Sequence, residues 1–221
     1  MLILEHISIL DYNLLSMIAV ITGDIIHSKR HEPEQWLGVL KKLFKGSSEL
    51  LTDWEIYRGD EFQVEIPNPE NALLMALKIK ATIKTISTLD VRLSIGLGEK
   101  TYTGKSVSES NGPAFSNSGE QLSKMKKQKI NLLIKSDNEA LDKELNIIFK
   151  LGAVIWDNWS EVSAELALIL LQNPHQVQEK IAQTLGIKQA AVSQRFKRSE
   201  MALVLETERY YKDKILSLET R

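Results

Sequence analysis

The sequence predicts an α+β protein in which a ferredoxin-like domain precedes an all-α helix-turn-helix domain. Between residues 17 and 99 the hydrophobic patterns follow the order strand, helix, two strands, helix, strand. That order is the split βαβ, or ferredoxin-like, plan of an antiparallel sheet with helices on one face. After Asn138 the patterning is helical throughout, and a glycine separates two short segments near the carboxyl end. We therefore expect one domain over residues 17–155 and a second over residues 156–221.

The composition is that of an ordinary globular protein. The chain has 221 residues, of which 43% are hydrophobic and 26% charged, and this length suits a larger domain followed by a small module. A net charge of −1 gives no global attraction to nucleic acid or membrane, so such affinity must come from local charge. The absence of cysteine excludes disulfides, thiolate zinc sites and a cysteine nucleophile, and we expect a cytoplasmic protein.

The first patterned strand covers residues 17–24, a continuous apolar run that ends in Gly-Asp and reads as a buried central strand. The preceding residues, 1–16, are apolar but are interrupted by charged residues. This run is shorter than the roughly 20 residues that span a bilayer, and it lacks the basic start of a signal peptide. We interpret residues 1–16 as an N-terminal extension, with Met17 as an alternative natural start.

Four further elements complete the predicted ferredoxin-like plan. Residues 31–46 carry apolar side chains spaced for one helix face, with Pro33 in the first turn and Gly46 just past the end. Alternating residues over 54–66 predict two strands that meet at a turn near Arg58–Asp60. A proline-opened helix follows from residue 67, and alternation over 91–99 predicts the last strand of the plan.

The remainder of the first domain and the start of the second are less regular. Residues 101–118 are rich in glycine and serine, which predicts a loop. A basic helix over 119–129 and a strand over 130–137 follow, and Asn173-Pro174 later interrupts the helical pattern. Trp156 and Trp159 are expected to be core or interdomain anchors.

The segment 177–199 has the spacing of a helix-turn-helix. Ile181 and Ala182 lie on the packed face of a first helix, and Gly186 permits a left-handed turn after it. Val192 and Phe196, four residues apart, anchor a second helix. The segment resembles the helix-turn-helix of sigma-factor and response-regulator proteins, with Phe196 in place of the usual aliphatic residue. An alternative interpretation is a plain helical hairpin with a solvated polar face.

This packing leaves a polar surface on the second helix that is suited to duplex DNA. The residues expected to face outward are Lys188, Gln189, Ser193, Gln194, Lys197 and Arg198. Glutamine and serine can read base edges, whereas lysine and arginine contact phosphates or guanine. Residues 173–221 contain nine Lys/Arg and six Asp/Glu, a local excess of positive charge. The tail from Met201 is expected to be a helix that serves dimerisation or packs on the first domain.

Two aspartates in the first domain are candidates for a metal site. Asp24 ends the central strand and Asp60 lies in the hairpin that is predicted beside it. Converging carboxylates suit Mg²⁺ or Mn²⁺ bridging a nucleoside triphosphate, with Lys29 and Arg30 adding charge for the phosphates. The competing interpretation is that Gly59-Asp60 forms a tight turn and Asp24 caps a helix.

Four blocks of this domain support a family resemblance. ITGDIIHSKR, YRGDEFQVEI, VRLSIGLGE and GPAFSNSGEQL resemble, in that order, the motif blocks of the palm domain in class III nucleotidyl cyclases. The hairpin block is also similar to the GGDEF motif of diguanylate cyclases. With its C-terminal module, the chain resembles the SatD family of bacterial proteins over roughly residues 17–215. The resemblance implies a palm fold and metal positions at Asp24 and Asp60.

The sequence departs from the cyclase pattern at catalytic positions. Aligned on Gly112, the asparagine and arginine that steady the phosphates are replaced by Ser116 and Glu120, and the base-selecting lysine falls at Ile56. A transition state that builds negative charge needs cationic donors, which an acidic Glu120 opposes. We therefore do not expect cyclase activity.

Three functional hypotheses follow. The preferred one is a homodimeric regulator of transcription that binds double-stranded DNA and whose palm-like domain senses a nucleotide or divalent metal, without membrane attachment. The second is an active metal-dependent nucleotidyl cyclase or nucleotide-transfer enzyme with a regulatory tail. The third is an interaction protein whose C-terminal helices bind another protein.

Overall fold

The computed structural model describes residues 17–57 and 59–218, so the predicted extension over residues 1–16 lies outside the described residues. The fold is α+β, as predicted, and its centre is a five-stranded mixed sheet of order β2-β3-β1-β4-β5. The strands are β1 (Met17–Ile26), β2 (Asp53–Tyr57), β3 (Glu61–Ile66), β4 (Asp90–Glu99) and β5 (Leu132–Lys135). The first four strands pair antiparallel, whereas β5 joins β4 in parallel and so departs from the predicted antiparallel sheet.

Helices are the regular elements that follow β5 in the described residues, and others lie between the strands. They are α2 (Pro33–Lys45), α3 (Ala72–Lys84), α4 (Pro113–Gln128), α5 (Glu139–Trp156), α6 (Glu161–Gln172), α7 (Gln178–Leu185), α8 (Gln189–Arg198) and α9 (Met201–Leu216). Short 3-10 turns occur at η1 (Ser28–Arg30), η2 (Pro69–Asn71) and η3 (Val107–Glu109). The expected order of strand, helix, hairpin, helix and strand is therefore present.

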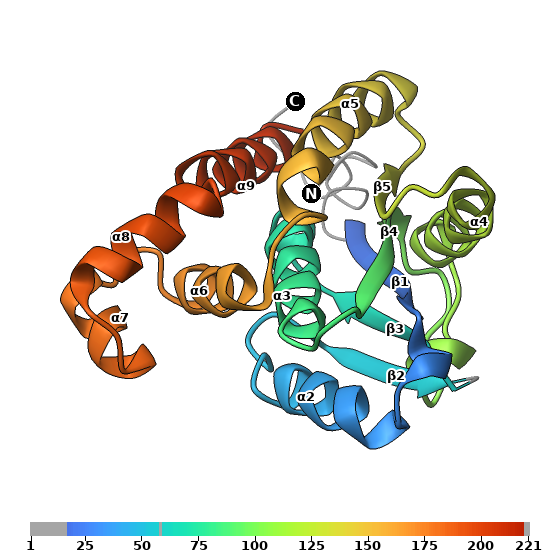
Figure 1. Ribbon diagram of the computed structural model, residues 1–221. Coiled ribbons are helices and arrows are strands. Elements are labelled where there is room, and N and C mark those ends of the chain that lie inside the picture. Colours follow the sequence, from blue (N-terminus) through green and yellow to red (C-terminus); the bar gives the residue numbers. More distant parts are fainter. Residues whose placement is uncertain (1–16, 58, 219–221) are drawn as a thin grey trace, which may run out of the picture.

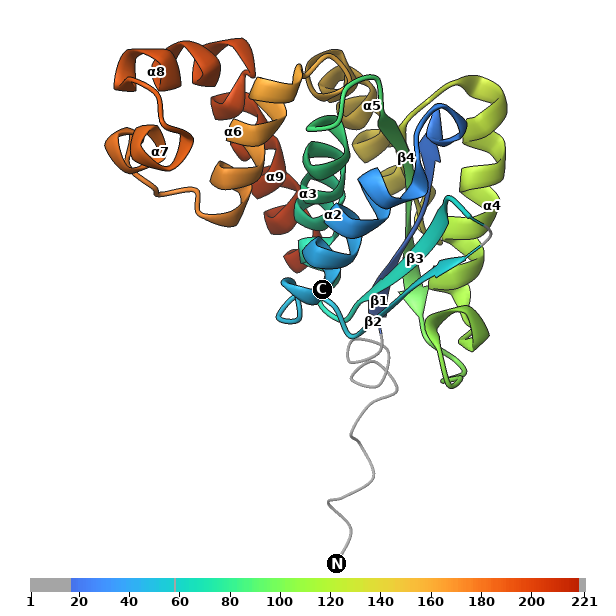
Figure 2. The ribbon, with the colours of Figure 1, turned by 60° about the horizontal axis from the view of Figure 1, so that its bottom comes forward.

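Helices cover both faces of the sheet, whereas the sequence predicted them on one face. Helices α2 and α3 lie on one side and α4 on the other (Figure 1, Figure 2). Alternation along β1 explains this: Ala19 and Ile21 join the main core, while Val20 packs with Ala114 and Phe115 of α4. The close approach of α4 depends on Gly96, because a Cβ there would lie 2.1 Å from the Ala114 carbonyl oxygen.

Helix α4 begins at Pro113, six residues before the predicted start at 119. Gly112 precedes it with φ 147°, and Pro113 occupies the first turn, where a missing N–H costs nothing. Ala114 and Phe115 supply its first buried contacts. The glycine and serine content of the segment concealed this helix, because long-range packing against the sheet stabilises it.

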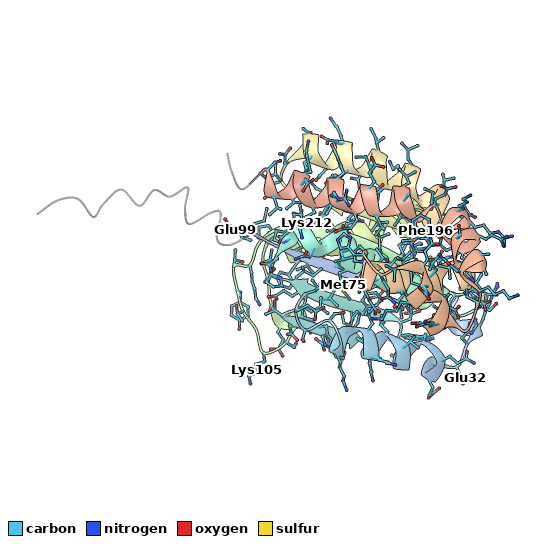
Figure 3. The ribbon with its side chains drawn as sticks, turned by 90° about the vertical axis from the view of Figure 1, so that its left-hand side faces the viewer. Glu32, Met75, Glu99, Lys105, Phe196 and Lys212 are labelled. Atoms are coloured by element: carbon cyan, nitrogen blue, oxygen red, sulfur yellow. The ribbon has the colours of Figure 1, made fainter. Side chains whose placement is uncertain are left out.

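The C-terminal helices pack against α3, on the side of that helix away from the sheet (Figure 2). One hydrophobic core includes Phe62 of the sheet, Leu166 of α6 and Val192 of α8. Met75 of α3 is fully buried and lies near the middle of the view in Figure 3. The boundary predicted at residue 155 falls at the end of α5, and the division into two domains stays a prediction.

Candidate functional site

Two short helices near the carboxyl end meet at a glycine, as the sequence predicted. Gly186 ends α7 in the left-handed region, with φ 63° and ψ 32°. The Ile187 N–H donates to the Ala182 carbonyl at 3.0 Å, which closes the turn. Ile181, Ala182 and Val192 are buried, so the packed sides of α7 and α8 are those that the spacing indicated.

The opposite side of α8 presents a basic surface to solvent. Lys188, Gln189, Gln194, Lys197 and Arg198 are exposed, and Ser193 is half-buried. We call these six residues the α8 surface. No acidic residue occurs from Lys188 to Ser199. Arg195, the other cation of α8, is held by Glu165 of α6 at 3.3 Å, whereas the three cations of the α8 surface form no ion pair with any described residue.

A tryptophan fixes the end of α8. The indole N–H of Trp159 donates to the Ser199 carbonyl at 3.1 Å, and both residues are buried. Phe196, partly buried against the core, lies among the C-terminal helices (Figure 3). Because Trp159 lies in the short connection between α5 and α6, it ties α8 to the point where the chain turns from one helix into the other.

The predicted metal ligand Asp24 is engaged by cations. Arg92 lies opposite it in the β1–β4 pairing, and the Arg92 Nη1 atom donates to both carboxylate oxygens at 3.0 and 2.9 Å. Lys126 of α4 lies 4.0 Å from the same carboxylate and 2.8 Å from Glu61, the β3 neighbour of Asp24. The carboxylate charge is therefore balanced by protein groups.

Asp60 lies close to Asp24, as predicted from the adjacent strands. The Ile25 N–H donates to the Asp60 carbonyl at 3.1 Å, and the Ser28 hydroxyl donates to the Asp60 carboxylate. Burial raises the pKa of Asp24; Arg92 and Lys126 oppose this shift, and the charge of Asp60 adds to it. Among the described residues no group of three or more His, Cys, Asp or Glu could hold a metal ion. A cation at Asp24 would have to displace Arg92.

A comparison with protein-family models gives one match. The model of the SatD family matches residues 17–215, which is most of the chain. The chain belongs to the SatD family. No curated protein matches it. In this SatD-family chain, no helix within the described residues is long and apolar enough to cross a membrane.

The structure of this SatD-family protein also places the remaining predicted residues. Lys29 and Arg30 lie in η1, are exposed, and make no side-chain hydrogen bond or ion pair with the described residues. Sequence reasoning missed Arg92 and Lys126 as the partners of Asp24. The available signal was Arg92 itself, a charged residue in an apolar central strand, which requires a nearby acid.

Replacing Arg92 is expected to destabilise this SatD-family protein. Arg92→Met leaves the Asp24 carboxylate, whose side chain is 14% exposed, without its bidentate partner. We expect the free energy of unfolding to fall by about 2 kcal/mol. Urea denaturation of Arg92→Met in the wild-type and Asp24→Asn backgrounds measures the contribution of the ion pair to stability. The loss of unfolding free energy should be smaller when residue 24 is already neutral. An equal loss in both backgrounds would show that the ion pair contributes nothing.

Proposed function

We propose that this SatD-family protein is a transcriptional regulator that binds double-stranded DNA with a helix-turn-helix formed by α7 and α8. The observation that carries the proposal is the α8 surface, which is basic, rich in glutamine and free of acidic residues. The left-handed turn at Gly186 and the buried residues below it hold that surface in place. A plain helical hairpin needs no such segregation of cations.

The dimensions of α8 suit the major groove. Its ten residues span about 15 Å, and the groove is about 12 Å wide. Gln189 and Gln194 carry amides that can contact base edges, whereas Lys188, Lys197 and Arg198 suit phosphates. Binding of a fluorescent random-sequence duplex, measured by anisotropy at low salt, tests the proposal, and absence of binding would contradict it.

We assign the first domain to a cyclase-like palm that senses a ligand and does not transform it. The strand order β2-β3-β1-β4, with α2 and α3 on one face, supports a palm of the ferredoxin-like kind. The pairing of Asp24 with Arg92 speaks against catalysis through a Mg²⁺ or Mn²⁺ ion at that carboxylate. A polar cavity of about 660 Å³ beside it, with Gln63 and Lys126 in its walls, is large enough for a nucleotide.

A homodimer through α5 is part of this proposal. Ile147, Leu151 and Val154 lie four and three residues apart on α5 and are 59%, 68% and 70% exposed. Such spacing places them on one helix face, and a second copy of the same face is a self-complementary partner. Reader helices of this kind commonly bind DNA in pairs.

Leu151→Glu is expected to convert the dimer into a monomer, because it places a charge in the centre of the apolar face. Analytical ultracentrifugation measures the change. Tyr102→Glu is the matched control, since Tyr102 is 62% exposed but belongs to a loop distant from α5 in sequence. A wild-type protein that sediments as a monomer, or a Leu151→Glu variant that remains dimeric, would contradict the proposal that this face of α5 is the dimer interface.

A further inference from the structure

A second cavity lies where the sheet, α4 and the C-terminal helices meet. Its volume is about 640 Å³, within the range of small-molecule sites. The ends of β1, α3 and α4 form one side, and Trp159–Glu161, at the start of α6, form the other. The same Trp159 donates to Ser199 at the end of α8. A ligand in this cavity would therefore contact both the palm-like domain and the segment that anchors α8.

Backbone strain is concentrated around this cavity. Four non-glycine residues of the described chain have positive φ, and three of them, His27 at 68°, Thr88 at 64° and Lys129 at 57°, line it. The fourth, Glu200, follows Ser199. Left-handed backbone is unfavourable for side-chain-bearing residues and tends to be retained at functional sites. Lys129 is the clearest case, because it occupies the position after α4 that glycine usually takes.

The charged groups of the cavity favour an anion. Lys84, Arg92 and Lys129 line it together with the imidazole of His27. Lys84 is held by Asp90 and Arg92 by Asp24, so Lys129 is the lining cation that has no ion pair with a described residue. The side chains of Lys129 and His27 are exposed and make no hydrogen bond or ion pair with any described residue. Lys129 and His27 are therefore the side chains of this cavity that are free to contact an anionic ligand, among those that the structure describes.

The remaining walls favour an organic group on that anion. Ile26, Ile86, Leu89 and Trp159 provide apolar surface next to the cations. Glu161 provides a carboxylate that can accept hydrogen bonds from hydroxyl or amino groups, whereas Asp90 is already engaged by Lys80 and Lys84. A phosphate monoester joined to a small polar organic group matches this combination of cations, apolar surface and acceptors.

We propose that this cavity binds a small organic phosphate and is a second ligand site of the regulator, separate from the cavity beside Asp24. The proposal deepens the proposed function and rests on it for its biological role, but the binding step itself requires no DNA. The phosphate would lie against Lys129 and His27. The organic group would lie against Trp159, which connects the occupied site to α8.

The test uses the full-length protein and two phosphate monoesters, AMP and glycerol 3-phosphate, in calorimetric titrations without DNA. Adenosine and glycerol are the controls that lack phosphate. Binding with a Kd below about 1 mM by at least one monoester, and none by its control, is expected. Preference for AMP or for glycerol 3-phosphate distinguishes a nucleotide from a simpler metabolite. Failure of both monoesters would overturn the proposal and would leave the DNA-binding proposal untouched.

Two variants separate binding from folding. Lys129→Gly removes the cation and relieves the left-handed strain, so we expect a Tm no lower than that of the wild type and an affinity weaker by about tenfold. Lys127→Ala, on the exposed side of the same helix end and outside the cavity, should bind normally. Unchanged affinity in Lys129→Gly, or an equal loss in Lys127→Ala, would show that this cavity is not the site.

Discussion

Replacing Lys197 and Arg198 together by alanine is expected to weaken duplex DNA binding by about tenfold or more at moderate salt. Both side chains are exposed and unpaired among the described residues, so each is available to a phosphate. Every lost phosphate contact reduces the number of counterions released, and the slope of log K against log[salt] should become shallower by about two. Fluorescence anisotropy at several salt concentrations gives both quantities.

A matched pair of lysines on α4 controls for nonspecific charge. Lys124 and Lys127 are also exposed, and they form no hydrogen bond or ion pair with the described residues. Lys124→Ala with Lys127→Ala removes the same charge from a different face of the protein. We expect this control to retain nearly the wild-type affinity and salt slope. Equal losses of DNA affinity in the two double variants would indicate a general electrostatic attraction to DNA, without a specific role for α8.

Lys80→Met is expected to cause the largest loss of stability. The ammonium of Lys80 is 1% exposed and lies 2.8 Å from Asp90 and 2.5 Å from Asp157. Removing it leaves two largely buried carboxylates short of a partner, at a cost of about 3–5 kcal/mol. For a protein of this size the corresponding fall in Tm is about 10 °C, measurable by calorimetry.

Lys78 provides the control within the same helix. It is 6% exposed, yet its side chain makes no hydrogen bond or ion pair with a described residue, and burial lowers its pKa. Lys78→Met should therefore leave stability unchanged or raise it by about 1 kcal/mol. The gain should diminish as pH rises through the lowered pKa, because the folded wild type then releases the proton while the unfolded chain retains it. A large loss in Lys78→Met would contradict this account of α3.

The sequence was sufficient to predict elements whose signals are local. The spacing of the apolar residues predicted the order of strands and helices. Gly186 and its apolar neighbours predicted the turn between α7 and α8. The exposure of Lys197 and Arg198 followed from the same spacing. The closeness of Asp24 and Asp60 followed from two strands that were correctly predicted as neighbours.

Features that depend on long-range contacts were not predictable in this way. The salt bridge from Arg92 to Asp24 joins residues 68 positions apart, and the bond from Trp159 to Ser199 spans 40 positions. Helix α4 was mistaken for loop at its start because its stability comes from packing on Gly96. The cavity with strained Lys129 has no sequence motif, since the ends of β1, α3 and α4 and the starts of β4 and α6 form it together.

The most direct test of the account is an NMR titration of isotope-labelled protein with a random-sequence DNA duplex. We predict that amide shifts concentrate on Gly186 and on α8 from Gln189 to Arg198, and that α4 is little affected. Shifts centred on the lysines of α4, or no shifts on α8 while the duplex is bound, would contradict the assignment of α7 and α8 as the DNA reader.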